Sequence, residues 1–321
     1  MNAPTTLQAW VHTLSHAADD ILRIELRADG GAALPAFEPG AHIDLHLPNG
    51  LVRSYSLAND SRETHRYVLG VLKDRASRGG SRCVHEQLRI GTRLTISAPR
   101  NHFPLHPEAT HSVLIAGGIG ITPILCMARA LHSQGRSVEV IYCARQRSGL
   151  AFADELQALG IPITWHLDNE AGGPPDLRAL LAARPDTGGV HYYACGPAVM
   201  LDAFEQLCAE LGYAHAHIER FAAVEVKAAD DARQTYTVEL RRSGQTLEVT
   251  PDTTLHQVLI DHGAPVPFSC QEGICGSCET PVLEGEPDHR DSVLTASERA
   301  ANKVMMVCVS GCKSARLVLD L

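Results

Sequence analysis

Positive charge is scarce in this chain of 321 residues. It carries 28 lysines and arginines against 37 aspartates and glutamates, a formal net charge of −9. Proteins that bind nucleic acid need a basic surface, so no nucleic-acid partner is expected. Residues 1–20 also lack the basic segment and the apolar stretch of a secretory signal peptide. We therefore expect a cytoplasmic protein.

Long uninterrupted hydrophobic runs are missing as well. Only residues 112–128 approach the length of a membrane span without a charge, and three glycines and Pro123 interrupt them. A buried strand, a turn and a helix explain this stretch better than a single span does. No membrane association is expected, and the length predicts about two or three domains.

Histidine patterns typical of metal sites are absent, although the chain has 17 histidines. No His-x-x-x-His pair with a partner carboxylate lies in a segment with a clear helical pattern. His42 and His46 fall in a strand-like segment, and so do His215 and His217. We interpret the histidines as surface residues or hydrogen-bonded core residues.

Cysteine, by contrast, is plentiful and patterned. Cys270, Cys275 and Cys278 are spaced as C-x4-C-x2-C, and Cys308 follows thirty positions after Cys278. This is the spacing of the thiolates that hold a plant-type [2Fe–2S] cluster. We predict that these four cysteines are the metal ligands.

Structural zinc is the main alternative, but it usually needs two close Cys pairs and only Cys275 and Cys278 form one here. A disulfide framework belongs to small secreted chains. Gly273 and Gly276 allow the tight turn that wraps a cluster. Cys312 is left over and is predicted to be a non-ligand.

Residues 1–104 consist of short alternating segments separated by Gly, Pro and Asn turns, which predicts an antiparallel β-barrel or sandwich. Within them, residues 53–56 (Arg-Ser-Tyr-Ser) offer a cation, an aromatic face and hydroxyls that suit a flavin nucleotide, although an ordinary amphipathic strand has the same pattern. Residues 77–81 place glycines before a helix, where backbone N–H groups can hold a phosphate; a solvated loop is the alternative.

Strands and helices alternate over residues 105–222, which predicts a parallel, Rossmann-like sheet. After an apolar strand, residues 117–120 (Gly-Gly-Ile-Gly) turn toward a helix that we expect to begin with Thr122 as its N-cap, an arrangement that lets a pyrophosphate approach. Residues 195–197 (Cys-Gly-Pro) stand at the carboxyl end of the last strand, where such sheets bind ligands. A buried structural thiol is the alternative for Cys195.

The remaining chain predicts a linker and a third unit. Residues 221–234 have little periodicity, and from residue 235 a hairpin, a helix and the cysteine loop indicate a compact α+β unit. The expected domains are residues 1–104 (flavin-binding β-barrel), 105–222 (NAD(P)H-binding α/β domain), 223–234 (linker) and 235–321 (plant-type ferredoxin).

The three motifs in this order resemble the phthalate dioxygenase reductase family, which includes the vanillate demethylase reductases. The resemblance covers essentially the whole chain. It implies an NADH-dependent reductase that passes electrons through FMN and a [2Fe–2S] cluster to a Rieske-type aromatic oxygenase. Since NADH gives two electrons at once and the cluster takes one, a flavin belongs between them.

The resemblance also implies roles for individual residues. Ser56 and Cys195 would position the flavin and nicotinamide rings for hydride transfer. The flavin-binding residues would be Arg53, Ser54, Tyr55, Ser56, Lys73, Gly80, Ser81, Thr122 and Phe221. The nicotinamide nucleotide would contact Gly117, Gly118, Cys195, Gly196, Pro197 and Met200.

Three alternatives remain open at this point. Arg145 and Arg147 follow the second strand of the nucleotide domain and could attract the 2′-phosphate of NADPH. A self-contained NAD(P)H oxidase or diaphorase would use oxygen or a quinone as acceptor. A redox sensor would merely bind the flavin and the cluster.

Overall fold

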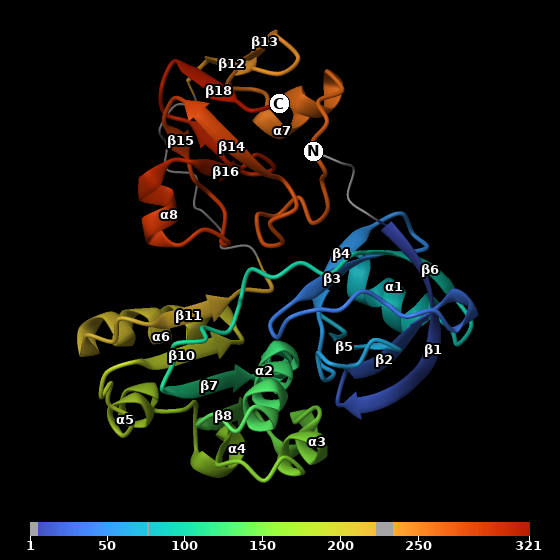
Figure 1. The fold of residues 1–321 in the computed structure, drawn as a ribbon, viewed down its shortest axis with the longest axis vertical. Helices are drawn as coiled ribbons and strands as arrows, with labels where there is room; N and C mark the ends of the chain where they lie inside the picture. Colours follow the sequence, from blue (N-terminus) through green and yellow to red (C-terminus); the bar gives the residue numbers. More distant parts are fainter. Residues whose placement is uncertain (1–5, 76, 223–233) are drawn as a thin grey trace. The chain divides into compact units, whose positions relative to one another are not determined.

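The computed structural model describes residues 6–75, 77–222 and 234–321 (Figure 1). The chain divides into two compact units, one ending at Arg220 and the other beginning at Phe221. Of the predicted linker 223–234, residues 223–233 lie outside the described residues. The chain is thus multidomain, and each unit is described by itself.

The first part of the larger unit is a six-stranded sheet and one helix. Its elements are β1 (Thr6–Ala18), β2 (Ile21–Ala28), β3 (His42–His46), β4 (Val52–Ser56), β5 (Tyr67–Leu72), α1 (Gly80–Gln87) and β6 (Arg93–Ser97). The strand order is β4-β3-β6-β1-β2-β5, with every pair antiparallel. An isolated bridge between Leu57 and Leu69 joins the segment after β4 to β5. Alternate side chains such as Ile24, Ile43 and Leu69 fill the core inside the sheet.

One strand is longer than the short strands predicted for this region. β1 runs for 13 residues, and its register shifts between Val11 and Thr13 and between His16 and Ala18. Such bulges break the regular alternation on which strand prediction depends.

The second part of the larger unit is a five-stranded parallel sheet with helices (Figure 1). Its strands are β7 (His111–Gly117), β8 (Val138–Ala144), β9 (Ile163–Leu167), β10 (Val190–Cys195) and β11 (Ala216–Glu219). Its helices are α2 (Ile121–Ser133), α3 (Ala153–Gln157), α4 (Asp168–Ala171), α5 (Leu177–Ala182) and α6 (Ala198–Leu211).

Both faces of this sheet are covered, in the order β11-β10-β7-β8-β9. Along β7, Leu114 and Ala116 belong to one buried cluster, while Val113 and Ile115 belong to another. A strand buried on both faces must be apolar at consecutive positions, which explains the unbroken hydrophobic run in the sequence. The stretch 112–128 is therefore a strand, a turn and a helix, as predicted.

The start of α2 differs from the prediction. Gly118–Gly120 form a 3₁₀ turn that leads directly into the helix, and Gly120 occupies the N-cap position. Thr122 already lies in the first turn and donates its hydroxyl to the Ile119 carbonyl at 3.2 Å. The prediction of Thr122 as N-cap was wrong because the glycines themselves adopt helical turns.

The smaller unit has a five-stranded sheet, a two-stranded sheet and two helices. Its elements are β12 (Tyr236–Leu240), β13 (Gln245–Val249), α7 (Leu255–Asp261), β14 (Glu279–Glu284), β15 (Pro287–Asp288), α8 (Ala296–Ala301), β16 (Val304–Met306), β17 (Gly311–Cys312) and β18 (Arg316–Leu319). The main order is β13-β12-β18-β14-β16. Thr254 caps α7 by accepting from the Gln257 N–H at 3.1 Å. No helix in the described ranges is long and apolar enough to cross a membrane.

Candidate functional site

Strand β4 carries the predicted flavin residues on two faces. Ser54 pairs with Asp44 across the sheet, and its Oγ donates to Asp44 Oδ1 at 2.7 Å. Arg100 donates to the other oxygen of Asp44 at 2.7 Å, so the Ser54 hydroxyl belongs to a protein network. Tyr55 points to the opposite face, where it packs against the apolar core and burial raises the pKa of its hydroxyl.

Arg53 meets the start of helix α1. A side chain on Gly80 would come within 2.7 Å of the Arg53 Cγ, so only glycine lets the arginine lie against this helix end. Ser81, in the first turn, donates to Ser77 Oγ at 3.0 Å. Lys73 is already paired with Glu86 on the same helix at 3.0 Å. The structure thus places Arg53 and Ser81 at the helix start, whereas the Lys73 side chain is held by Glu86 near the helix end.

The two glycine motifs of the parallel sheet contact one another at its carboxyl edge. A side chain on Gly120 would overlap the Cys195 carbonyl, and one on Gly196 would come within 3.0 Å of the Gly117 Cα. A side chain on Gly117 would also meet Pro197 and Met200, at 2.7 Å and 2.9 Å. The predicted nucleotide residues therefore form a single close-packed site, with Gly118 in the left-handed region (φ +54°).

Cys195 ends β10 and is completely buried. Burial, and then the nearby Glu219, raises the pKa of its thiol above the ordinary value. The group stays a neutral thiol, which does not suit nucleophilic attack.

Glu219 is a functional candidate that the sequence did not reveal. It is the register neighbour of Cys195 on β11, and Ser56 Oγ donates to its Oε2 at 3.2 Å. Burial raises the pKa of Glu219 to about 8, and the Ser56 hydrogen bond opposes that rise. Ser56, Cys195 and Glu219 therefore come together where the antiparallel and parallel sheets meet. The only sequence signal for Glu219 was its place at the carboxyl end of a four-residue strand.

Thr122 and Phe221, both predicted to bind the flavin, lie in different surroundings. A side chain on Gly70 of β5 would meet Thr122 Cγ2 at 2.8 Å, which places Thr122 at the contact between α2 and the antiparallel sheet. Phe221 begins the smaller unit, and 38% of its surface is exposed.

In the smaller unit, Cys270, Cys275, Cys278 and Cys308 are all buried in one place. The neighbouring Cys270 thiol lowers the pKa of Cys275, and the neighbouring Cys278 thiol lowers the pKa of Cys308. The Glu272 N–H donates to Cys270 Sγ at 3.3 Å. Four converging sulfurs with inward-facing N–H groups fit a [2Fe–2S] cluster.

The loop around these sulfurs depends on Gly273 and Asp291. Gly273 has φ +68°, and a side chain there would come within 2.7 Å of Val309 Cγ2. Asp291 is buried and accepts from the N–H groups of Val293 and Leu294 at 3.0 Å and 2.8 Å. Cys312 lies apart, with its thiol 3.2 Å from the Ser314 carbonyl oxygen.

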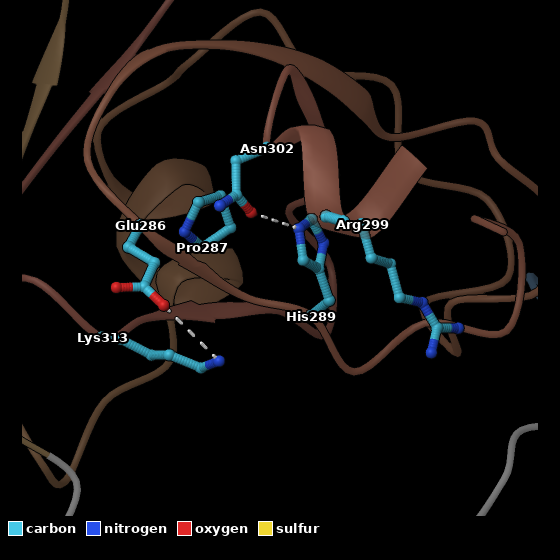
Figure 2. Close-up of a pocket in the computed structure, with 7 residues that line it drawn as sticks. Glu286, Pro287, His289, Arg299, Asn302 and Lys313 are labelled. Carbon is cyan, nitrogen blue, oxygen red and sulfur yellow. Dashed lines mark hydrogen bonds and ion pairs between the residues drawn. The ribbon is translucent and has the colours of Figure 1, made fainter. Parts of the chain in front are cut away.

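A hollow of about 340 Å³ also lies on the smaller unit (Figure 2). Several of its polar groups are already paired: Lys313 with Glu286 at 3.8 Å, and His289 Nε2 with Asn302 Oδ1 at 3.0 Å. Arg299, on its rim, donates to the Asp291 carbonyl at 2.6 Å. None of the predicted site residues lines the hollow, so we assign no cofactor to it.

Comparison with known proteins gives two family matches. Residues 238–313 match the 2Fe-2S iron-sulfur cluster binding domain. Residues 92–218 match the N-terminal domain of the dimethylamine monooxygenase subunit DmmA-like family.

Three curated relatives align with nearly the whole chain. The phenoxybenzoate dioxygenase subunit beta of Ectopseudomonas oleovorans is 46% identical over 99% of this chain and 98% of its own length. The vanillate O-demethylase oxidoreductase of Pseudomonas sp. (strain HR199 / DSM 7063) is 46% identical over 98% and 100%. The tetrachlorobenzoquinone reductase of Sphingobium chlorophenolicum is 45% identical over 100% and 99%.

Two solved structures extend the comparison. Phthalate dioxygenase reductase, described as a modular structure for electron transfer from pyridine nucleotides to [2Fe-2S], is 39% identical with a TM-score of 0.71, and 98% of each chain is covered. An intact type IV self-sufficient cytochrome P450 monooxygenase is 39% identical with a TM-score of 0.89. The match covers 98% of this chain and only 41% of that longer one.

Proposed function

The chain belongs to the phthalate dioxygenase reductase family, and we propose that it is the NADH-dependent reductase component of an oxygenase system. Its cofactors are FMN and a [2Fe–2S] cluster, and NADH is the electron donor. The observation that carries this function is the near-complete alignment, at 46% identity, with two proteins named as parts of a dioxygenase and a demethylase.

When bound, the flavin supplies the conversion of a two-electron hydride donor into single electrons for the cluster. The protein contributes binding, orientation and charge. Arg53 and the start of α1 would hold the flavin phosphate, supported by their close packing at Gly80. Ser56 and Cys195 would position the two reacting rings, and the four buried cysteines would hold the cluster.

The finer architecture belongs to the same proposal. We interpret the antiparallel sheet, bridged at Leu57 and Leu69, as a flavin-binding barrel over residues 1–104. The parallel sheet would be the Rossmann-like domain of residues 105–222, followed by the linker 223–234 and the ferredoxin domain 235–321.

The choice of NADH over NADPH has a structural rationale. Arg147, one of two arginines that could attract a 2′-phosphate, lies 3.3 Å from Glu170. A paired guanidinium offers less charge to a second anion. The first turn of α4, which follows β9, carries Asp168 and Glu170 and so adds acidic groups to this region. Carboxylates here would favour the free ribose hydroxyl of NADH over the 2′-phosphate of NADPH.

The acceptor is the point that experiment must test. We propose a Rieske-type oxygenase, and the second candidate is a quinone, since one relative is named as a quinone reductase. Anaerobic reduction of a purified Rieske oxygenase by NADH should require catalytic amounts of this protein. The rate of oxygenase reduction is compared with the rate of benzoquinone reduction and with the rate for a heat-inactivated oxygenase. If the oxygenase is reduced more slowly than the benzoquinone and no faster than the inactivated control, the quinone is the acceptor.

Electron delivery should weaken as salt increases. Residues 234–321 carry twelve acidic against seven basic residues, a net charge of −5. Two of these acidic residues are already paired within the protein, Glu284 with Arg316 and Asp288 with Arg290. Fewer carboxylates therefore remain for a partner protein. Glu279 remains exposed directly after Cys278. Transient redox complexes are small and charge-steered, so we expect a severalfold loss of oxygenase reduction between about 20 and 500 mM NaCl.

Stopped-flow reduction of the oxygenase measures this salt effect. The double variant Glu272→Gln/Glu279→Gln should show a clearly smaller salt slope. Asp252→Asn removes one charge from the turn after β13 and should keep the wild-type slope. Equal slopes in all three proteins would contradict docking through the cluster loop.

Glu219 should give flavin reduction a pH dependence. Its pKa is raised from 4.5 to about 8, so the carboxyl is neutral below pH 8 and negative above it. A negative charge beside Ser56 opposes delivery of a hydride to the flavin. We expect the rate of flavin reduction by NADH to fall about fivefold from pH 7 to pH 9, an effect of about 1 kcal/mol.

Glu219→Gln should make this rate nearly flat over the same range, while Glu210→Gln on α6 should retain the midpoint near pH 8. A midpoint preserved in Glu219→Gln would assign the titration to another group. The folded state keeps this proton between pH 4.5 and about 8, and the unfolded state loses it. This carboxyl therefore lowers stability as pH rises through that window.

A further inference from the structure

Three histidines converge on the larger unit at a place separate from the proposed redox site. His191 lies on β10 and His217 on the adjacent strand β11, while His106 lies on the segment between β6 and β7. One ring nitrogen of each lies within 4.8 Å of the other two. We call these three residues the histidine cluster.

The spacing of the cluster fits a tetrahedral ion. His191 Nδ1 and His217 Nε2 are 3.0 Å apart. Two nitrogens bound to tetrahedral Zn²⁺ at 2.0–2.1 Å lie about 3.4 Å from each other. Binding an ion would therefore separate this pair slightly and turn both rings, whose planes now differ by 15°, toward the ion. The proton that these nitrogens share would move to a distal ring nitrogen, since a neutral imidazole offers a lone pair from either position.

Glu108 orients His106, the third proposed ligand. Its Oε1 lies 3.1 Å from His106 Nδ1, and a carboxylate opposite a ring nitrogen must accept the proton there. The other nitrogen, Nε2, is then free to bind a metal. Carboxylates orient metal-binding histidines in this way in many zinc sites.

Hydrogen bonding among the described residues leaves one nitrogen of the cluster without a partner. Only 1% of His191 is exposed, and its Nε2 has no hydrogen-bond partner within the described part of the chain. Buried polar atoms nearly always have a partner. His215 stacks on His191 with ring centroids 4.3 Å apart, and His106 stacks on His217 at 4.5 Å.

We propose that His106, His191 and His217 bind a divalent transition-metal ion, with Zn²⁺ as the ion that best fits three imidazoles and a tetrahedral geometry, and with Glu108 orienting His106.

The ion would tie the segment between the two sheets to the parallel sheet. His106 is already held there, since its N–H donates to the Tyr193 hydroxyl at 3.0 Å and its carbonyl accepts from Arg136 at 2.9 Å. His191 and Cys195 share one face of β10 but are four residues apart, or about 13 Å along a strand. The ion would therefore stabilise the larger unit without taking part in hydride transfer.

The test is calorimetric titration of the tag-free holoprotein with Zn²⁺, since a loaded cluster keeps its own cysteines occupied. Wild type should bind one equivalent. His106→Gln and His217→Gln should weaken binding at least tenfold, and Glu108→Gln about tenfold. His132→Gln, an exposed residue on α2, should bind as wild type does.

Equal Zn²⁺ affinity in wild type, His106→Gln and His217→Gln would overturn the proposal. If His217→Gln fails to fold, the partly exposed His106 decides the matter alone. Anomalous diffraction at the zinc edge, from crystals grown with one equivalent, should give a peak among the three imidazoles. A strongest peak at any other position would equally reject the site.

Discussion

Replacing Cys275 with serine is expected to remove the [2Fe–2S] cluster and to reduce electron delivery to the oxygenase at least a hundredfold. The same variant should take hydride from NADH into its flavin within about twofold of the wild-type rate. The reason is that the two units have separate hydrophobic cores, one built around Val238, Leu259 and Leu317 and the others confined to the larger unit. Units with their own cores fold independently. Iron content and anaerobic stopped-flow absorbance measure the two effects.

Cys312→Ser is the matched control. Cys312 is the fifth cysteine of the smaller unit, and its sulfur contacts the Glu286 and Ser314 carbonyls at 3.4 Å and 3.2 Å. This variant should keep its iron and its electron delivery. Loss of flavin reduction in Cys275→Ser would contradict the modular mechanism, and loss of iron in Cys312→Ser would contradict the assignment of the four ligands.

The features that the sequence could predict were local motifs. Cys270, Cys275 and Cys278 lie within nine positions, and a loop of that spacing has few other uses. The glycines at 117–120 and the Cys-Gly-Pro at 195–197 were also recognisable, because each motif ends a strongly apolar strand. The resemblance then supplied their roles.

What the sequence could not predict depends on contacts between distant positions. Ser56 and Glu219 are 163 positions apart and meet only because two sheets pack together. The strand that carries Glu219 is four residues long, too short for a clear pattern. His106, His191 and His217 likewise share no motif spacing, and only the pairing of β10 with β11 places the last two on neighbouring strands. Thr122 was misplaced because the 3₁₀ turn before it is set by the packing of the glycines.

The contact between the two glycine motifs leads to the second large effect. Gly120 has a right-handed backbone (φ −60°, ψ −7°), which alanine adopts without strain. A methyl group there would nevertheless overlap the backbone carbonyl of Cys195. Gly120→Ala must therefore push the end of β10 away from β7. We expect a loss of about 3 kcal/mol in the free energy of unfolding, a melting temperature lower by about 10 °C, and at least a tenfold loss in flavin reduction by NADH.

Gly135→Ala separates this packing effect from ordinary glycine strain. Gly135 follows α2 with φ +66°, and nothing lies within 4 Å of the position of an added methyl group. Its replacement should cost about 1 kcal/mol, from the left-handed backbone alone, and leave flavin reduction unchanged. Thermal unfolding followed by circular dichroism, together with stopped-flow reduction, compares the two variants. If Gly120→Ala is no worse than Gly135→Ala, the two motifs do not press against each other, and the nucleotide site cannot depend on their contact.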